Sequence, residues 1–300
     1  ERIKMSAPNF IIAGAARCGT TSLFYYLKQH PDIAFPNKKE PRYFSSLGQA
    51  YPHNGPGDQT VDRSIVRDFL NYERLFEGLD SFTCVGEASS DYLFFHQVSA
   101  EAIYNRLGDI PIILCLRNPV DRAYSAFNNL VRDQRETLPF EAALIAEDKR
   151  LAENWDWMWA YKAGGLFANQ VSTFLRKFSR VKVVIFDDLA SEPNAVVRDL
   201  FAFLGVDDTI AVNTKTKYSH SGKAKNRLIA LASNRNSVTA FTLRRLALAV
   251  LPRSVLEHIA SKSLEQDVMS NETRTELIQF FQEDISHLET LIGRSLTAWR

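Results

Sequence analysis

Short runs of consecutive apolar residues recur along the chain and predict buried strands. The clearest run covers residues 111–116 (PIILCL) and is apolar throughout, as expected of a parallel strand that is covered on both faces. Residues 9–14, 82–86 and 181–186 have a similar strand-like composition. These four runs are the strands that the hydrophobic pattern predicts.

Helical spacing of apolar positions falls between these runs. Residues 20–29 place Leu23, Tyr26 and Leu27 on one face and stop at His30-Pro31. Further helices are predicted for residues 66–76, for a segment that begins at Asn118-Pro119, for residues 195–204 before Gly205, and for residues 271–292.

Alternating strands and helices predict an α/β fold, with a central parallel sheet flanked by helices on both faces. We find no internal repeat, no low-complexity tract and no linker that divides the 300 residues. The interpretation is therefore a single domain over residues 1–300, although the chain can also be a piece of a larger biosynthetic protein.

The composition is that of an ordinary soluble enzyme, with 45% hydrophobic and 24% charged residues. Cys18, Cys84 and Cys115 are scattered and odd in number, which predicts reduced thiols in the cytoplasm rather than disulfides or a structural zinc site. The net charge of +1 argues against a nucleic-acid partner. No apolar run reaches the roughly 20 residues of a membrane span, and no signal peptide precedes the first strand. The sequence does not indicate the oligomeric state.

The turn after the first strand has the form of a phosphate-binding loop. Gly14 and Gly19 have the G-x-x-x-x-G spacing of a nucleotide-hydrolase loop. Backbone N–H groups at such a turn, followed by a helix, suit an anion. However, Thr20 stands where those enzymes carry lysine, and the cation is Arg17. A tight turn with an incidental arginine is the alternative interpretation.

A second anion-binding motif follows the strand at residues 111–116. Arg117 ends this strand, where a magnesium-dependent nucleotide hydrolase would carry an aspartate. Arg117 and Ser125, two turns into the next helix, can converge on one phosphate through forked N–H donors and a hydroxyl. The sequence therefore predicts a site for two separate phosphate groups without a metal.

The chain resembles the 3′-phosphoadenosine 5′-phosphosulfate (PAPS)-dependent sulfotransferases, especially the heparan sulfate branch and its bacterial relatives. The resemblance implies a P-loop-like fold, PAPS as the donor, 3′-phosphoadenosine 5′-phosphate (PAP) as the product, and no metal. Its motifs run in order along nearly the whole chain: AARCGTTSL, HPDI, KKEPRYF, GEASSDYL, LRNPVDRAYS, VVIFDDLASEP, FLGV and LETLIGRSLTAW.

The resemblance also implies roles for individual residues. Arg117 and Ser125 fall on the 3′-phosphate pair. A late basic loop over the cofactor, which can equally be a solvated turn, contains Tyr218, Lys223, Lys225 and Arg227. The 5′-phosphosulfate loop corresponds to Arg17, Cys18, Gly19, Thr20, Thr21 and Ser22.

Sulfuryl transfer needs a base for the acceptor hydroxyl, positive charge near the transferring oxygens, and stabilisation of the leaving phosphate. The resemblance makes Glu40 the leading base, and the basic residues around it are expected to keep it ionised. Glu87 (with its neighbour Asp91) and His53 are the other candidates. Arg17 is expected to stabilise the leaving phosphate.

Two positions depart from the family. Most relatives have lysine at position 17 and many have histidine at position 42, whereas this chain has arginine at both. Arginine keeps the charge but is planar and does not act as a point cation. A histidine-assisted base at position 42 is therefore in doubt.

Trp155, Trp157 and Trp159 alternate with other residues and form either one wall of an acceptor pocket or part of the core. An aromatic wall and a near-neutral charge favour a small or partly apolar acceptor, such as a hydroxyacyl or polyketide chain on a carrier protein, a lipid or a neutral sugar. A polysaccharide acceptor is the alternative. Two rival functions are a metal-dependent kinase and an inactive nucleotide-binding scaffold. The kinase would need a lysine in the phosphate-binding loop and a magnesium-binding carboxylate, and this sequence has neither at the expected position.

Overall fold

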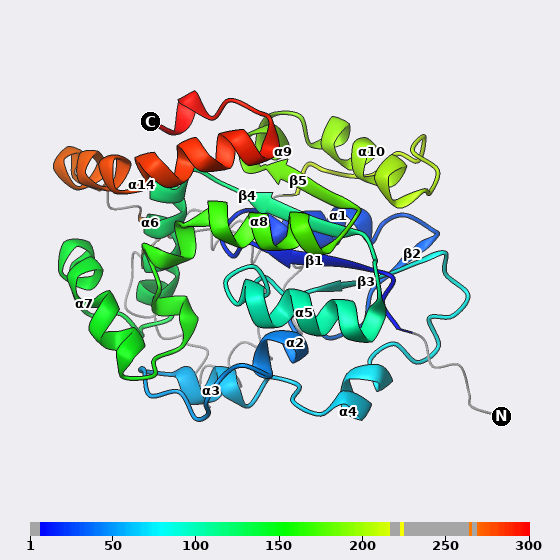
Figure 1. Ribbon diagram of the computed structural model, residues 1–300, viewed down its shortest axis with the longest axis horizontal. Coiled ribbons are helices and arrows are strands. Elements are labelled where there is room, and N and C mark those ends of the chain that lie inside the picture. Colours follow the sequence, from blue (N-terminus) through cyan, green and yellow to red (C-terminus); the bar gives the residue numbers. More distant parts are fainter. Residues whose placement is uncertain (1–6, 217–222, 225–263, 266–268) are drawn as a thin grey trace.

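The computed structural model describes residues 7–216, 223–224, 264–265 and 269–300. Its centre is a parallel sheet with the strand order β2-β3-β1-β4-β5 (Figure 1). Every residue of the fourth strand has zero exposure to solvent, which explains its unbroken apolar composition. The strands are β1 (Phe10–Gly14), β2 (Ile33–Ala34), β3 (Cys84–Ala88), β4 (Ile112–Leu116) and β5 (Val181–Ile185).

The predicted parallel sheet is confirmed, and each predicted strand lies within about two residues of an observed one. The pattern did not reveal β2, because a strand of only two residues carries no periodicity. A short separate ladder pairs β6 (Lys223–Ala224) with β7 (Leu264–Glu265).

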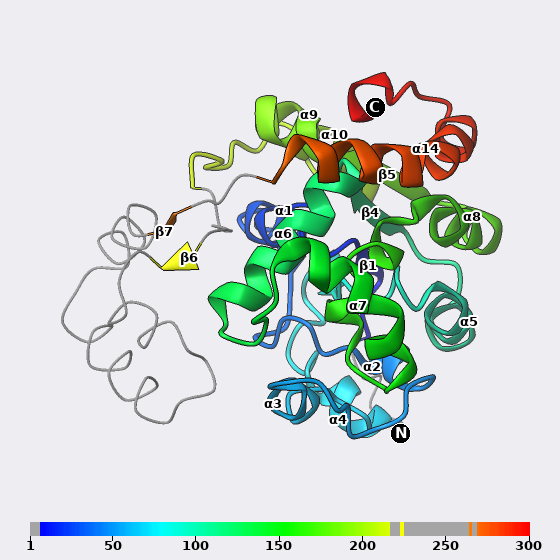
Figure 2. The same cartoon turned by 90° about the vertical axis from the view of Figure 1, so that its left-hand side faces the viewer.

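Helices cover both faces of the sheet. Figure 2 shows α1 on one side of the strands and α5 and α8 on the other. The predicted helices are present, and α14 has the predicted bounds. The helices are α1 (Thr20–Leu27), α2 (Tyr43–Ser46), α3 (Asp58–Asp62), α4 (Phe69–Arg74), α5 (His96–Leu107), α6 (Pro119–Arg132), α7 (Phe140–Ala152), α8 (Phe167–Lys177), α9 (Phe186–Ser191), α10 (Pro193–Leu204) and α14 (Asn271–Ile292).

The carboxyl ends of three neighbouring strands meet at one edge of the sheet, because β1 lies between β3 and β4 and all three are parallel. The Gly-rich turn follows β1, the GEASSDYL segment continues from β3, and Arg117 follows β4. This edge is where ligands bind in open α/β sheets. None of the helices within the described residues has the length and apolar character that a membrane crossing requires.

Candidate nucleotide and catalytic site

The turn between β1 and α1 is held tightly against the sheet. The backbone N–H of Ala15 donates to the carbonyl of Cys115 at 2.8 Å. Gly19 has a φ of 97°, in the left-handed region, and a Cβ there would lie 3.0 Å from side-chain atoms of Phe186 and Leu189. Glycine therefore suits this position on two counts. The turn runs into α1, whose first N–H groups have no partners within the helix and are available to an anion.

A cavity of about 160 Å³ lies beside this turn. Arg117 contributes a guanidinium that sits 4.7 Å from the ring centroid of Phe186. The described residues that line the cavity include no carboxylate, which fits a binding site for anions. They are Arg17, Gly19, Thr20, Thr21, Ser22, Tyr26, Arg117, Ser125, Phe186, Leu189, Ala190, Pro193 and Thr214.

The cavity brings together most of the predicted cofactor residues from both motifs. Cys18 differs from its neighbours, since it is fully buried and burial raises the pKa of its thiol to about 11. Lys223 lies in β6. Tyr218, Lys225 and Arg227 lie outside the described residues.

Arg17 connects the two motifs. Its Nε donates to Oγ of Ser125 at 3.1 Å, and its Nη1 donates to Oδ1 of Asn129 at 3.2 Å. Burial, followed by the nearby charges of Arg132 and Arg117, lowers the pKa of Arg17 to about 10. The guanidinium thus remains charged at neutral pH. Cations gathered this closely repel one another, and a bound polyanion relieves that repulsion.

Arg122 supports the backbone of the turn between β1 and α1. Its side chain is almost fully buried, and it donates to the carbonyl oxygens of Ala160 at 2.8 Å and of Ala16 at 3.4 Å. Gly164 makes room for it, because a Cβ there would lie only 2.3 Å from Nη1. Arg122 and Asn129 belong to the helix that contains Ser125, but their roles depend on tertiary contacts that the sequence pattern does not indicate.

Glu40 lies between β2 and α2, beside the last residue of β3, in a turn with left-handed backbone at Glu40 and Arg42 (φ 58° and 56°). Its N–H donates to the carbonyl of Ala88 at 3.0 Å. Its carboxylate accepts a hydrogen bond of 2.9 Å from the N–H of Ser90. The Oγ of Ser90 is also within 3.2 Å of both carboxylate oxygens. These contacts hold the carboxylate in one orientation.

Lys39 joins this carboxylate to α1, the helix that follows the Gly-rich turn. Its Nζ lies 2.9 Å from Oε1 of Glu40 and donates to Oγ1 of Thr21 at 3.3 Å. Burial raises the pKa of Glu40, but the charges of Lys39 and Arg42 outweigh it, and the net pKa lies below its ordinary value. Glu40 is therefore ionised at neutral pH. From the sequence, Lys39 is only one of the basic residues around Glu40, since its bridge to Thr21 is a tertiary contact.

Glu87 and His53 do not line the cavity beside Arg17. Glu87 is fully buried and accepts a hydrogen bond of 3.3 Å from the hydroxyl of Tyr72. Burial raises its pKa to about 8, so it carries a proton at neutral pH.

His53 is buried as well, with Nδ1 2.7 Å from Oδ1 of Asp62 and 3.9 Å from Oδ2 of Asp156. Each of these three residues has one side-chain atom that could bind a metal ion, and the three atoms lie within 4.8 Å of one another. The positive charge of Arg42 acts on Asp156, and His53 is already engaged with Asp62. We therefore describe the group as a buried polar network.

The tryptophan-rich segment belongs mainly to the core. Trp157 is 4% exposed and Trp159 is fully buried. Nε1 of Trp159 donates to Oδ1 of Asp58 at 3.0 Å, and this buried carboxylate also pairs with Arg135. Of the two interpretations of these tryptophans, the structure favours packing over an open aromatic wall.

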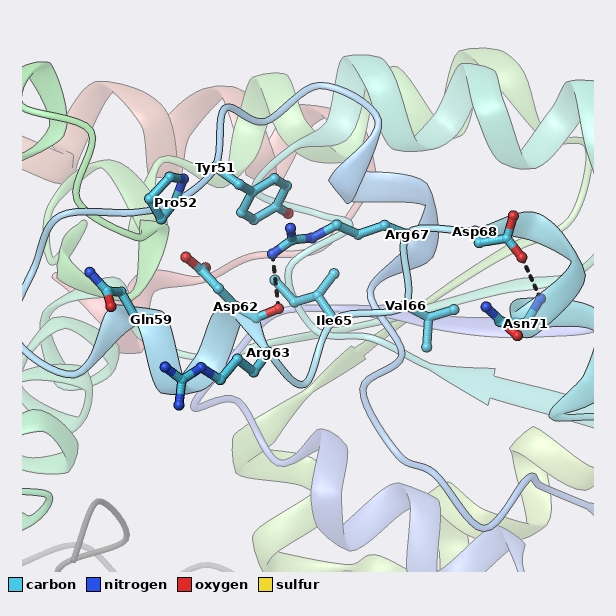
Figure 3. Close-up of a pocket in the computed structure, with 10 residues that line it drawn as sticks. All are labelled: Tyr51, Pro52, Gln59, Asp62, Arg63, Ile65, Val66, Arg67, Asp68 and Asn71. Carbon is cyan, nitrogen blue, oxygen red and sulfur yellow. Dashed lines mark hydrogen bonds between the residues drawn. The ribbon is translucent and has the colours of Figure 1, made fainter.

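A larger, more open cavity of about 700 Å³ lies next to the Glu40 turn (Figure 3). Arg67 stacks on the ring of Tyr51 at 3.8 Å and donates to the carbonyl of Asp62 at 2.9 Å. Val66 connects the cavity to the turn, since its N–H donates to the carbonyl of Pro41 at 2.9 Å. The lining is partly apolar and partly charged: Tyr51, Pro52, Gln59, Asp62, Arg63, Ile65, Val66, Arg67, Asp68 and Asn71.

Comparisons with known proteins find sulfotransferases among the similar chains. A crystal structure of a sulfotransferase from Alicyclobacillus acidocaldarius is 38% identical, with a TM-score of 0.79 over 98% of this chain and 99% of that one. The membrane-associated sulfotransferase kil1 of Dictyostelium discoideum is 33% identical over 40% of this chain and 22% of its own length. The mouse heparan sulfate glucosamine 3-O-sulfotransferase 3B1 is 25% identical over 66% of this chain and 46% of its own length.

The chain thus spans less than half the length of these two curated relatives. The Sulfotransferase family model matches residues 8–209. This range contains β1 to β5, Glu40, and every residue that lines the cavity beside Arg17 except Thr214. The chain therefore belongs to the sulfotransferase family.

Proposed function

We propose that this protein transfers a sulfuryl group from PAPS to a hydroxyl group of an acceptor and releases PAP. One observation carries the proposal: Lys39 contacts both Thr21 of the phosphate-binding turn and the carboxylate of Glu40. A base for the acceptor is thereby held beside the groups that bind the donor. Such proximity of a base and a reacting group is what transfer by in-line displacement requires.

The residues of the cavity have distinct roles in this proposal. Arg117 and Ser125 hold the 3′-phosphate, and the turn with the first N–H groups of α1 holds the 5′-phosphosulfate. Arg17 and Lys39 place positive charge where the leaving phosphate gains negative charge. PAPS supplies the sulfuryl group: the acceptor oxygen forms the new S–O bond as the bond to the 5′-phosphate oxygen breaks. Glu40 takes the proton of the acceptor hydroxyl. No step uses a metal.

We further propose a small or partly apolar acceptor, bound in the cavity of Figure 3. The apolar side chains of Ile65 and Val66 and the charges of Arg63 and Arg67 share its lining, which suits a molecule with a hydroxylated end and an apolar part. Hydroxyacyl or polyketide chains on a carrier protein, lipids and neutral sugars belong to this class, and a polysaccharide is the alternative. Action in the cytoplasm is part of the proposal.

Transfer of ³⁵S from labelled PAPS tests the proposal. The acceptor panel consists of p-nitrophenol, octyl glucoside, a 3-hydroxyacyl thioester and de-sulfated heparan. We expect a labelled product with at least one member of the panel, and its absence in Glu40→Gln. Stabilisation by PAP without transfer to any acceptor would favour the inactive scaffold. Stabilisation only by ATP with magnesium would favour the kinase.

A further inference from the structure

Asn129 lies one helical turn after Ser125 on α6, and Arg132 lies three residues further on. Residues three or four apart share one face of a helix, so these three side chains project towards the same side of α6. The turn after β1 contacts this face. Arg17 donates from Nε to Oγ of Ser125 at 3.1 Å and from Nη1 to Oδ1 of Asn129 at 3.2 Å. The guanidinium of Arg17 is therefore attached to α6 at two points.

The side-chain oxygen of Asn129 serves two arginines. Nη2 of Arg132 donates to the same Oδ1 at 2.8 Å. An amide oxygen has two lone pairs and can accept both hydrogen bonds. Because both neighbours are donors, the amide has to present its oxygen to them and not its NH₂ group. Nε and Nη2 of Arg132 also donate to Oδ1 of Asp133 at 3.1 Å each, which holds Arg132 in place.

The shared oxygen carries no net charge, and this matters for Arg17. After burial, the charge of Arg132 is the main cause that lowers the pKa of Arg17, so the two guanidinium groups repel each other. A carboxylate between them would relieve the repulsion, but it would also offset positive charge that the phosphates of PAPS need. An amide oxygen fixes the direction of the guanidinium and leaves its charge intact.

The described residues that line the cavity beside the turn include Arg17 and Ser125 but not Asn129. An effect of Asn129 on a ligand in that cavity is therefore expected to act through Arg17. We propose that Asn129 is a positioning residue, whose side-chain oxygen holds the guanidinium of Arg17 towards the cavity without neutralising it. This inference rests on the proposed role of Arg17 in binding PAPS.

Rotation within the Arg17 guanidinium tests the positioning without any ligand. In protein labelled with ¹⁵N-arginine, the guanidinium signal that disappears in Arg17→Met identifies Arg17. The hydrogen bond to Asn129 hinders rotation about the Cζ–Nη1 bond. This rotation should therefore be faster in Asn129→Leu, which keeps the size of the side chain but accepts no hydrogen bond. Equal rotation rates in the wild type and Asn129→Leu would overturn the inference.

Calorimetric titration with PAP tests the route through Arg17. Asn129→Leu should weaken PAP binding about 3- to 10-fold, the effect of one lost hydrogen bond. In Arg17→Met, which has no guanidinium to hold, the same substitution should change the affinity by less than about twofold. In Arg132→Met the loss should persist, because Arg17 is still present. A loss of equal size in the Arg17→Met background is what a purely structural role predicts, and it would contradict the proposal.

Asn129→Asp separates direction from charge. Its carboxylate still accepts the hydrogen bond, so the rotation should stay slow. PAP should nevertheless bind more weakly than to the wild type, because a negative charge now lies beside Arg17. Unchanged PAP affinity in Asn129→Asp would show that a neutral oxygen is not required.

Asn169→Leu makes the same change as Asn129→Leu at an exposed position on α8, and it should alter neither the rotation of Arg17 nor the affinity for PAP. If Asn129→Leu does not fold, Asn129→Ala takes its place in both measurements. The melting temperature of each variant without ligand shows whether it is folded.

The inference and the proposed function fail separately. If the wild type does not bind PAP, the proposed function loses its donor, whereas the rotation rate still decides whether Asn129 holds Arg17. If PAP binds, but Asn129→Leu changes neither the rotation nor the affinity, the inference fails and the proposed function stands.

Discussion

Nε of Arg17 donates a hydrogen bond of 3.1 Å to Oγ of Ser125, although 108 residues separate the two along the chain. Arg17 comes from the turn after β1 and Ser125 from α6, which follows β4. The two motifs predicted to bind anions are therefore in direct contact, and both line one cavity. A ligand that carries two phosphate groups would contact both motifs at once.

We expect PAP to bind without a metal and to raise the melting temperature. At one hundred times its dissociation constant, a ligand adds about 2.7 kcal/mol to the free energy of unfolding. The reason is the cationic cavity, in which Arg117 stands where a metal-binding carboxylate would otherwise be. The measurement is thermal unfolding with PAP in the presence of EDTA or of magnesium. A shift that requires magnesium would count against the two-phosphate site.

Arg117→Ala and Ser125→Ala should weaken PAPS binding more than they slow the reaction of bound PAPS. Losing one hydrogen bond to a charged group costs about 1.5–3 kcal/mol, which is roughly 10- to 150-fold in the dissociation constant. Calorimetric titration and single-turnover rates measure the two effects separately. Arg176→Ala, an exposed arginine on α8, is the control. Unchanged affinity in both variants would remove the assignment of the 3′-phosphate site.

Arg17→Ala should reduce both PAP affinity and turnover, because its charge acts on the donor before and during transfer. Arg17→Lys should retain substantial activity, since lysine keeps the positive charge. Its affinity for PAP should fall, because one ammonium group cannot reproduce both contacts of the guanidinium, to Ser125 and to Asn129. Affinity and kcat are measured for both variants. Equal losses in the two variants would show that the planar guanidinium, and not its charge, is essential.

Glu40→Gln should bind PAP normally and lose about 10²- to 10⁴-fold in turnover, the usual effect of removing a general base. Glutamine keeps the size of the side chain and can still accept the hydrogen bond from the N–H of Ser90. A large drop with an unchanged melting temperature therefore reports lost proton abstraction. Near-normal turnover would transfer the base role to another residue, and His53 would be tested next by His53→Gln.

Glu87→Gln should reduce the dependence of stability on pH. Burial raises the pKa of Glu87 to about 8, so the folded state holds a proton that the unfolded state releases above its ordinary pKa of about 4.3. The contribution of Glu87 to the free energy of unfolding is therefore complete at acidic pH and declines as pH rises towards 8. Each pKa unit corresponds to about 1.4 kcal/mol.

Urea unfolding at pH 5 and pH 8 measures this decline. Burial raises the pKa of Asp91 to about 7. Asp91 therefore changes the free energy of unfolding with pH in the same direction in both proteins, and this effect cancels when the two are compared. The difference in the free energy of unfolding between pH 5 and pH 8 should be smaller in Glu87→Gln than in the wild type. An identical pH dependence in the two proteins would show that Glu87 is ionised when buried.

The candidate site was only partly predictable from the sequence. Arg17, Arg117 and Ser125 were predicted because each occupies a fixed place relative to a strand end or a helix start, and local order decides that place. The bridging position of Lys39 was not predicted, because its contact with Thr21 depends on how the Glu40 turn packs against α1. His53 resembled an exposed loop residue in the sequence, but its pairing with Asp62 and the packing around Asp156 bury it.

The sequence by itself determined the parallel sheet, the flanking helices and the two turns that contain the candidate anion-binding residues. Those features depend on burial periodicity and on residues that are near one another in the chain. Only the tertiary structure decided which carboxylates are ionised and which side chains meet. Glu40 and Glu87 are both acidic residues in or next to β3, yet one is held ionised by Lys39 and Arg42 and the other is protonated by burial. The reason is that a pKa depends on charges and solvent within a few ångströms, and the fold brings those neighbours from distant parts of the chain.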